Sequence, residues 1–90
     1  MFVVICYDIP DDKRRNRVGK LLEGYGNRVQ KSVFECDLKP DNLSTLKLRL
    51  GKMIKKEDTL RYYYLCAQCL PKVEVLNGPP VTRAQLYFAV

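Results

Sequence analysis

Residues 2–9 constrain the fold of this chain more than any other segment. They are almost all β-branched or aromatic, which is the composition of a β-strand. Successive side chains of a strand point to opposite faces. Both faces here are mainly apolar, with Val3, Ile5 and Tyr7 on one and Val4, Cys6 and Asp8 on the other. Both faces of such a strand have to be covered by other parts of the protein.

Turn and cap residues divide the rest of the chain into further elements. Pro10-Asp11-Asp12 ends the first strand and supplies a helix N-cap, and apolar residues then recur at helical spacing as far as Tyr25. Pro40-Asp41-Asn42 caps a second helix, whose apolar stripe is Leu43, Leu46, Leu50, Met53 and Ile54. The remaining predicted elements are strands over residues 28–38, 60–67 and 72–76 and an extended piece over residues 81–90.

We take the order as strand, helix, strand, strand, helix, strand, followed by an extra strand. The first six elements are the ferredoxin-like order, in which right-handed crossovers place both helices on one face of an antiparallel sheet. The prediction is therefore one α+β domain over residues 1–90, with a core of residues 1–80 and a C-terminal strand over residues 81–90.

The second face of this sheet predicts an oligomer. The segment at residues 60–67 repeats the two-sided apolar character of the first strand, since Tyr62 and Tyr64 alternate with Tyr63 and Leu65. A chain of 90 residues that is 47% apolar has more apolar surface than a small monomer easily hides. We expect a homodimer in which the sheets of two copies lie face to face.

The charge of the chain points to a polyanionic partner. Its 16 Lys and Arg against 10 Asp and Glu give a net charge of +6. Membrane surfaces attract the same charge, but its distribution favours nucleic acid, because cations crowd into residues 13–31 with Glu23 as the one acid. No signal peptide or membrane span is visible, so we expect a cytoplasmic protein without a membrane partner.

The cysteines are interpreted as packing residues. Cys66-Ala67-Gln68-Cys69 has the spacing of a metal knuckle, but the chain has no second close pair and no histidine. A thiol buried as a small hydrophobic group is the commoner case. Tyr62, Tyr63 and Tyr64 are likewise interpreted as core and interface residues, because neighbouring residues on a strand point both ways.

Asp8 is the candidate catalytic and metal-binding residue. A carboxylate at the end of an apolar central strand costs free energy unless it is paired, hydrogen-bonded or bound to a metal. One interpretation is a helix or turn cap. The other needs the dimer: two Asp8 carboxylates near a two-fold axis can hold Mg²⁺ together with phosphate oxygens and waters. Because histidine is absent, metal-activated water is the expected source of a nucleophile.

The first helix supplies the candidate phosphate ligands. Arg14 continues its apolar stripe and Arg15 and Arg17 flank it, so all three are expected to reach the strand end that holds Asp8. Guanidinium groups there would bind phosphate bidentately. Lys52, Lys55 and Lys56 lie opposite the apolar stripe of the second helix and are interpreted as solubility residues or weak backbone contacts.

A family resemblance adds to this interpretation. It rests on three segments in order: Tyr7-Asp8-Ile9, Arg15-Asn16-Arg17 and Gln30-Lys31-Ser32-Val33-Phe34-Glu35. With the length and element order, they resemble the small CRISPR-associated protein of spacer acquisition, the dimeric partner of the CRISPR integrase. The resemblance covers essentially the whole chain.

The resemblance implies a ferredoxin-like homodimer in antiviral defence, with the final strand of one subunit completing the partner's sheet. Members are described either as Mg²⁺-dependent endonucleases, often acting on single-stranded RNA, or as scaffolds that hold duplex DNA between integrase dimers. A toxin-like ribonuclease on the same fold is a further alternative. Carried onto this chain, the metal residue is Asp8, and the supporting positions are Tyr7, Arg15, Arg17, Arg28 and Phe34.

Overall fold

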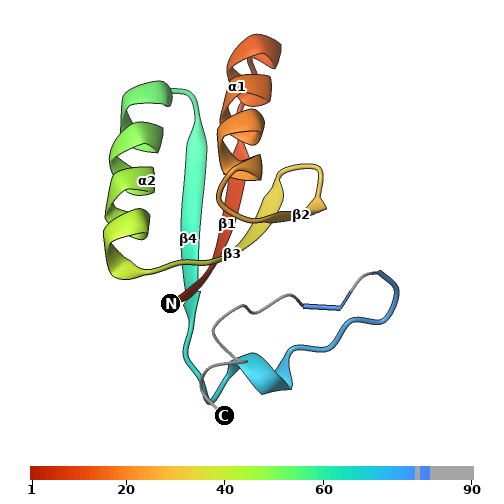
Figure 1. The fold of residues 1–90 in the computed structure, drawn as a ribbon. Helices are drawn as coiled ribbons and strands as arrows, with labels where there is room; N and C mark the ends of the chain where they lie inside the picture. The colour runs from red at the N-terminus through yellow and green to blue at the C-terminus, as the bar shows by residue number, and fades with distance from the viewer. Residues whose placement is uncertain (79, 82–90) are drawn as a thin grey trace.

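The computed structural model describes residues 1–78, 80 and 81. Its strands are β1 (Phe2–Asp8), β2 (Asn27–Gln30), β3 (Val33–Asp37) and β4 (Thr59–Leu65), and its helices are α1 (Asp12–Glu23) and α2 (Pro40–Met53). The strands form an antiparallel sheet in the order β2-β3-β1-β4, and α1 and α2 run alongside each other on one side of it (Figure 1). The predicted ferredoxin-like α+β fold is confirmed.

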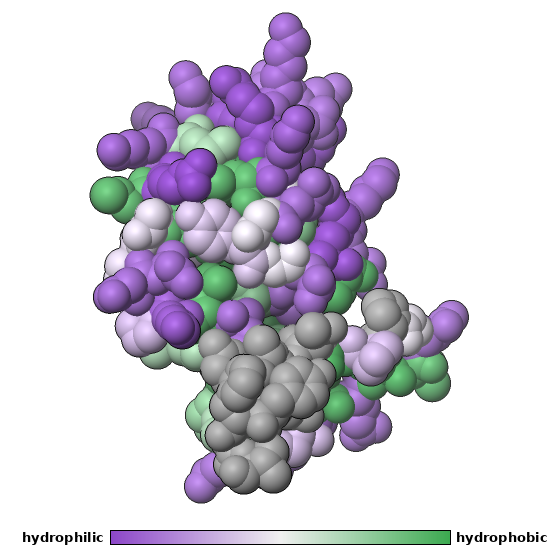
Figure 2. Space-filling view, in the orientation of Figure 1, coloured by the Kyte–Doolittle hydropathy of each residue, from purple (hydrophilic) through white to green (hydrophobic). Residues whose placement is uncertain are grey.

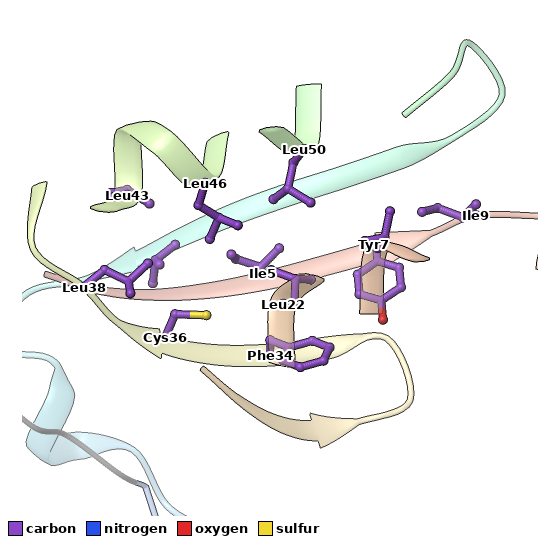
Figure 3. Close-up of a cluster of buried hydrophobic side chains, with 12 residues drawn as sticks. Ile5, Tyr7, Ile9, Leu22, Phe34, Cys36, Leu38, Leu43, Leu46 and Leu50 are labelled. Atoms are coloured by element: carbon purple, nitrogen blue, oxygen red, sulfur yellow. The ribbon is translucent and has the colours of Figure 1, made fainter. Parts of the chain in front are cut away.

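The core lies between β1 and the two helices. Val3, Ile5 and Tyr7 point to the helix side of the sheet and are buried. Figure 3 shows Leu22 of α1 and Leu46 of α2 pointing toward this row from their own elements. The buried side chains of each helix recur at three- and four-residue spacing, so they form one apolar stripe that packs against the sheet.

The other face of β1 carries the second predicted set of side chains. Val4 and Cys6 are half-buried and Asp8 is exposed. In the register of β1 with β4, Val4 lies opposite Tyr63 and Cys6 lies opposite Arg61. We call this side the open face, because α1 and α2 both lie on the other side of the sheet (Figure 1). The predicted alternation of the two faces is confirmed.

The predicted start of α1 is confirmed, and the start of α2 differs from the prediction. Asp11 is the N-cap of α1, and its carboxylate accepts a hydrogen bond from the backbone N–H of Arg14 at 2.8 Å. At α2 the cap position is Lys39, which makes no side-chain capping bond. Pro40 begins that helix instead, because its fixed φ suits the first helical turn and its missing N–H is not needed there.

The segment predicted as one strand over residues 28–38 is a hairpin. β2 and β3 are joined at Lys31 and Ser32 and pair antiparallel with a register shift between Arg28 and Gln30. The backbone N–H of Tyr7 donates to the carbonyl oxygen of Ser32 at 3.1 Å, which holds the turn beside the end of β1. This correction supplies the two adjacent strands that the ferredoxin-like order requires. A polar turn without glycine or proline gave no sequence signal.

The strand predicted over residues 72–76 is wrong. A 3₁₀ helix, η1 (Leu70–Lys72), follows a turn after β4, and the chain from Val73 to Gly78 is irregular. Pro71 sits in the first turn of η1, where its fixed φ favours a helical turn over a strand. Most of the predicted C-terminal strand, at residues 82–90, lies outside the described residues.

The interpretation of the cysteines as buried packing residues holds for part of the set. Cys36 is buried and Cys6 is half-buried, but Cys66 and Cys69 are exposed. The difference arises because β4 ends at Leu65, so Cys66 begins a surface turn instead of continuing a strand. Within the described part of the chain, no helix combines the length and the hydropathy needed to cross a membrane.

Candidate nucleic-acid interface

Asp8 is the last residue of β1 and is exposed on the open face. Among the described residues, its carboxylate takes part in no hydrogen bond and no ion pair. The capping role that was the alternative interpretation belongs to Asp11, whose side chain binds the first turn of α1. At the end of the central strand, the Asp8 carboxylate is therefore exposed and has no bonding partner among the described residues.

A polar cavity of about 450 Å³ lies beside this strand end, on the other side of β1. We call it the Tyr7 cavity, and its lining is Tyr7, Arg15, Asn16, Arg28, Lys31 and Ser32. Arg15 is fixed there by donating from Nη1 to the carbonyl oxygen of Ile9 at 2.9 Å, and it also pairs with Asp12. The structure thus brings the predicted residues Tyr7, Arg15 and Arg28 together from α1, β1 and the β2–β3 hairpin.

Phe34 and Tyr7 hold the guanidinium of Arg28 at the Tyr7 cavity. The Arg28 guanidinium carbon lies 4.7 Å from the centre of the Phe34 ring, and that ring stacks on Tyr7 with centroids 6.3 Å apart. Arg28 also donates to the carbonyl oxygen of Lys31 and pairs with Glu23 at 3.3 Å. Phe34 is fully buried, so its contribution to the cavity is to position Arg28.

Arg14 has internal partners instead of the predicted phosphate contact. It is 7% exposed, and its Nε and Nη2 donate to the two carboxylate oxygens of Asp58 at 2.6 and 2.9 Å. This bidentate pair holds the pKa of Asp58 below its usual range and raises that of Arg14. Arg14 does continue the apolar stripe of α1, as predicted. Its side chain, however, lies under the loop between α2 and β4. Arg14 is therefore not among the residues that line the Tyr7 cavity.

Arg17 does not line the Tyr7 cavity but a second basic surface between α1 and α2. This interhelix groove has a volume of about 860 Å³ and is lined by Arg17, Lys20, Leu21, Gly24, Tyr25, Arg49, Lys52 and Met53. Its lining holds four cations and no carboxylate. Figure 2 shows hydrophilic side chains gathered over the end of the molecule where α1 begins and α2 ends.

Sequence reasoning missed Arg49 and gave Lys52 a minor role. Arg49 donates from Nη1 to the hydroxyl of Tyr25 at 3.1 Å, so a contact between α2 and the turn after α1 fixes Arg49 in the interhelix groove. The available signal was weak, because a cation three residues from another on a helix usually marks a solvated face. The groove is formed by residues of both helices, so it depends on the packing of α1 against α2 and not on either helix alone.

Arg61 is a further cation that the sequence analysis passed over. It lies opposite Cys6 in the β1–β4 register, on the same face as Asp8, and donates to the Tyr63 hydroxyl at 3.0 Å. This hydrogen bond raises the pKa of Arg61. On the same face, partial burial raises the pKa of Glu35. The open face therefore carries a guanidinium, Arg61, whose position is fixed by Tyr63 opposite Val4.

The exposed carboxylate of Asp8 is compatible with one mode of Mg²⁺ binding. The described residues hold no cluster of three or more side chains of the kinds that ligate metals. Mg²⁺ in proteins is commonly bound by one or two carboxylates, with waters and substrate phosphates completing the shell. A single exposed carboxylate suits that mode, in which the other ligands come from outside the chain.

Comparisons with known proteins give the same family as the resemblance. The family model described as CRISPR associated protein Cas2 matches residues 1–73. The chain is 49% identical to a protein of Chloroflexus aurantiacus named CRISPR-associated endoribonuclease Cas2 1, over the whole of both chains. It is also 49% identical to CRISPR-associated endoribonuclease Cas2 3 of Synechocystis, covering 89% of this chain and 88% of that protein.

Solved structures agree with these sequence matches. Streptococcus pyogenes Cas2 superposes with a TM-score of 0.75 and 37% identity, covering 86% of this chain and all of that one. A chain of a partial Cas6-RT-Cas1–Cas2 complex superposes with a TM-score of 0.75 and 32% identity, covering 91% of this chain and 97% of that one. Because the family model, the sequence matches and the fold agree, this chain belongs to the Cas2 family of CRISPR-associated proteins.

Proposed function

We propose that this protein is a Mg²⁺-dependent endoribonuclease of CRISPR defence that acts as a homodimer in the cytoplasm. The observation that carries the proposal is the exposed Asp8 carboxylate, which has no partner within the described residues and stands at the end of the central strand. The names of the curated relatives, which are CRISPR-associated endoribonucleases, support the same activity.

The homodimer is proposed to form through the open face. Val4 and Cys6 are half-buried there, and Tyr63 is 48% exposed, so a second copy would cover apolar area that α1 and α2 leave uncovered. In a two-fold arrangement the same surface meets itself, so each Asp8 has a counterpart at the equivalent position. The two carboxylates then supply more of a metal site than one chain offers.

In this proposal each group near the strand end has a defined role. Asp8 holds the metal through a carboxylate oxygen. Arg15, Arg28 and Lys31 bind phosphate oxygens of the RNA backbone at the Tyr7 cavity, and their fixed positions reduce the ordering needed on binding. When bound, Mg²⁺ supplies charge stabilisation at the phosphate and lowers the pKa of a coordinated water. Tyr7 and Phe34 keep Arg28 in place.

The test is RNA cleavage by wild type and by the Asp8→Asn variant. The variant keeps the shape of the side chain but removes its charge, so we expect Mg²⁺-dependent cleavage of single-stranded RNA to fall at least about 100-fold, equivalent to about 2.7 kcal/mol of transition-state stabilisation. Asp41→Asn is the matched control, because Asp41 is also exposed but lies in the first turn of α2. Product formation is followed on labelled RNA, with Mg²⁺ or with a chelator.

Two results would contradict the nuclease proposal. Equal cleavage by wild type and Asp8→Asn would place the activity at another site or in a contaminant. No cleavage by wild type, together with tight binding of duplex DNA, would favour a scaffold that bridges integrase dimers. The interhelix groove supports that second candidate, since its four cations lie away from Asp8. A relative solved within a Cas6-RT-Cas1–Cas2 complex supports it as well.

A further inference from the structure

Two exposed thiols lie outside the proposed site, in the turn that follows β4. Cys66 and Cys69 are both free and both exposed. The backbone N–H of Cys69 donates to the carbonyl oxygen of Cys66 at 3.1 Å, and that of Leu70 donates to the same oxygen at 3.0 Å. These bonds reverse the chain at Ala67 and Gln68 and lead into η1. The exposure and the turn together separate this pair from the packing cysteine, Cys36.

The turn brings the backbone positions of the two cysteines within reach of a disulfide. A four-residue turn places its first and last Cα atoms within about 7 Å, and a disulfide spans Cα atoms about 4.4–6.8 Å apart. The two thiols also shift each other's pKa in opposite directions, as expected of neighbouring ionisable groups. The backbone therefore needs little rearrangement for a bond between the two sulfurs.

The surroundings assign different roles to the two thiols. The Cys69 thiol and the backbone N–H groups of Cys69 and Gln68 lower the pKa of the Cys66 thiol, because hydrogen bonding favours its thiolate form. Cys69 keeps its proton beside that sulfur, which raises its own pKa. The nucleophile in thiol chemistry is the thiolate. By contrast, burial raises the pKa of Cys36 to about 11.

Metal binding is a weaker explanation of this pair. A closed structural zinc site needs four ligands. Within the described part of the chain, no group of three or more cysteine, aspartate or glutamate side chains could hold a metal. Zinc would therefore need ligands from a second chain, whereas disulfide formation needs nothing beyond the turn itself and an oxidant.

We propose that Cys66 and Cys69 form a redox-active dithiol that small-molecule disulfides oxidise to an intramolecular disulfide. The Cys66 thiolate attacks one sulfur of the small disulfide, forms a mixed disulfide and releases the other half as a thiolate, which takes up a proton. Cys69 then loses its proton and attacks the Cys66 sulfur, and the second half leaves in the same way. The protein loses two electrons and two protons, and the small disulfide becomes two thiols.

The dithiol is remote from Asp8. Leu65, directly before the turn, pairs with Phe2 at the start of β1, whereas Asp8 is at the end of that strand. Six residue steps along a strand span about 20 Å. Oxidation would fix the turn between β4 and η1 without contact to the Tyr7 cavity. The inference is therefore independent of the proposed nuclease function and is tested separately.

The experiment treats the reduced full-length protein with glutathione disulfide near neutral pH and follows intact mass and peptide masses. Wild type should form a disulfide between Cys66 and Cys69 within one chain. Cys69→Ser should stop at a mixed disulfide on Cys66. Cys66→Ser should react at least about tenfold more slowly, because the remaining thiol lacks the backbone donors. Cys6→Ser is the control and should behave as wild type.

Three results would overturn this inference. Equal rates for Cys66→Ser and Cys69→Ser would show that the two thiols have no distinct roles. Disulfides that link separate chains would show that the turn does not direct the reaction. Zinc in the purified protein at a fixed ratio to the chain, lost in both variants, would show that the pair is a metal site shared between chains.

Discussion

Neighbouring arginines of α1 differ in role because of their burial. Arg14 is 7% exposed and bound to Asp58, whereas Arg15 lines the Tyr7 cavity and Arg17 lines the interhelix groove. The Asp58 side chain has no exposed surface, and one of its oxygens also accepts from the backbone N–H of Lys55 at 2.8 Å. The pair therefore ties α1 to the loop between α2 and β4. Removing one member would leave the other charge buried and without its partner.

The Arg14–Asp58 pair predicts a defined pH dependence of stability. The pKa of Asp58 is lower in the folded protein than in the unfolded chain, because Arg14 donates to its carboxylate. Its stabilising effect is thus fully present above the unfolded pKa of about 3.9 and is lost as the pH falls through the folded pKa. Asp58→Asn should lower Tm at pH 7, and its difference from wild type should shrink below about pH 4.

Thermal unfolding followed by circular dichroism between pH 2 and pH 7 measures this effect. Asp41→Asn is the control, since Asp41 is an exposed acid whose interaction with the N-terminal end of α2 contributes no more than about 1 kcal/mol. A difference between wild type and Asp58→Asn that stays constant down to pH 2 would contradict the assigned role of the pair.

At the scale of elements, the connection from α1 to β2 depends on close approach of the backbone to β3. Gly24 is the C-cap of α1, and the backbone N–H of Gly26 donates to the carbonyl oxygen of Leu22 at 3.0 Å. A Cβ at Gly26 would lie 2.5 Å from the carbonyl oxygen of Glu35 and would also meet the sulfur of Cys36. Because Gly26 has no side chain, the backbone after α1 can pack closely against β3.

Alanine at two glycines should have opposite effects on stability. Gly26→Ala should destabilise the protein by about 1–3 kcal/mol, because the backbone oxygen of Glu35 cannot move without disturbing β3. Gly51→Ala should stabilise it by up to about 1 kcal/mol, because Gly51 lies in α2 and a Cβ there meets nothing within 4 Å. Urea unfolding of both variants measures the two values. Equal effects would contradict the assigned close approach.

At the scale of the whole molecule, the two faces of the sheet differ. α1 and α2 cover one face, whereas the open face presents Val4, Cys6 and Tyr63 on the same side as the exposed carboxylate of Asp8. The open face is also where the sequence predicted that a second copy would lie. In the proposed homodimer, a single contact would bury the apolar residues of the open face. The same contact would bring the two Asp8 carboxylates together at the metal site.

The oligomeric state tests this link. Wild type should sediment at about twice the 10.5 kDa mass of the chain at micromolar concentration. Tyr63→Glu should shift the protein to monomer and reduce RNA cleavage with it, because charge on the open face opposes burial. Leu48→Glu is the matched control, since Leu48 is 63% exposed on α2. A monomeric wild type that cleaves RNA would contradict the shared site.

The sequence by itself determined the first strand, the two helices, the strand that follows the second helix, the two faces of β1 and the position of Asp8 at the strand end. These features follow from local rules: side chains alternate on a strand, apolar residues recur on a helix, and Asp11 caps the helix that follows it. The three quoted segments also predicted the family, which the comparisons confirm.

Only the tertiary structure decided what the individual side chains contact. It placed Arg14 on Asp58, 44 residues away, and it placed Arg49 beside Tyr25 to form the interhelix groove. It also ended β4 before Cys66, which exposed a pair of thiols that the sequence had suggested were buried. The physical reason is common to these cases. Charge, size and spacing fix the local conformation of a chain, but a side chain's partner depends on which distant segments the packed core brings beside it.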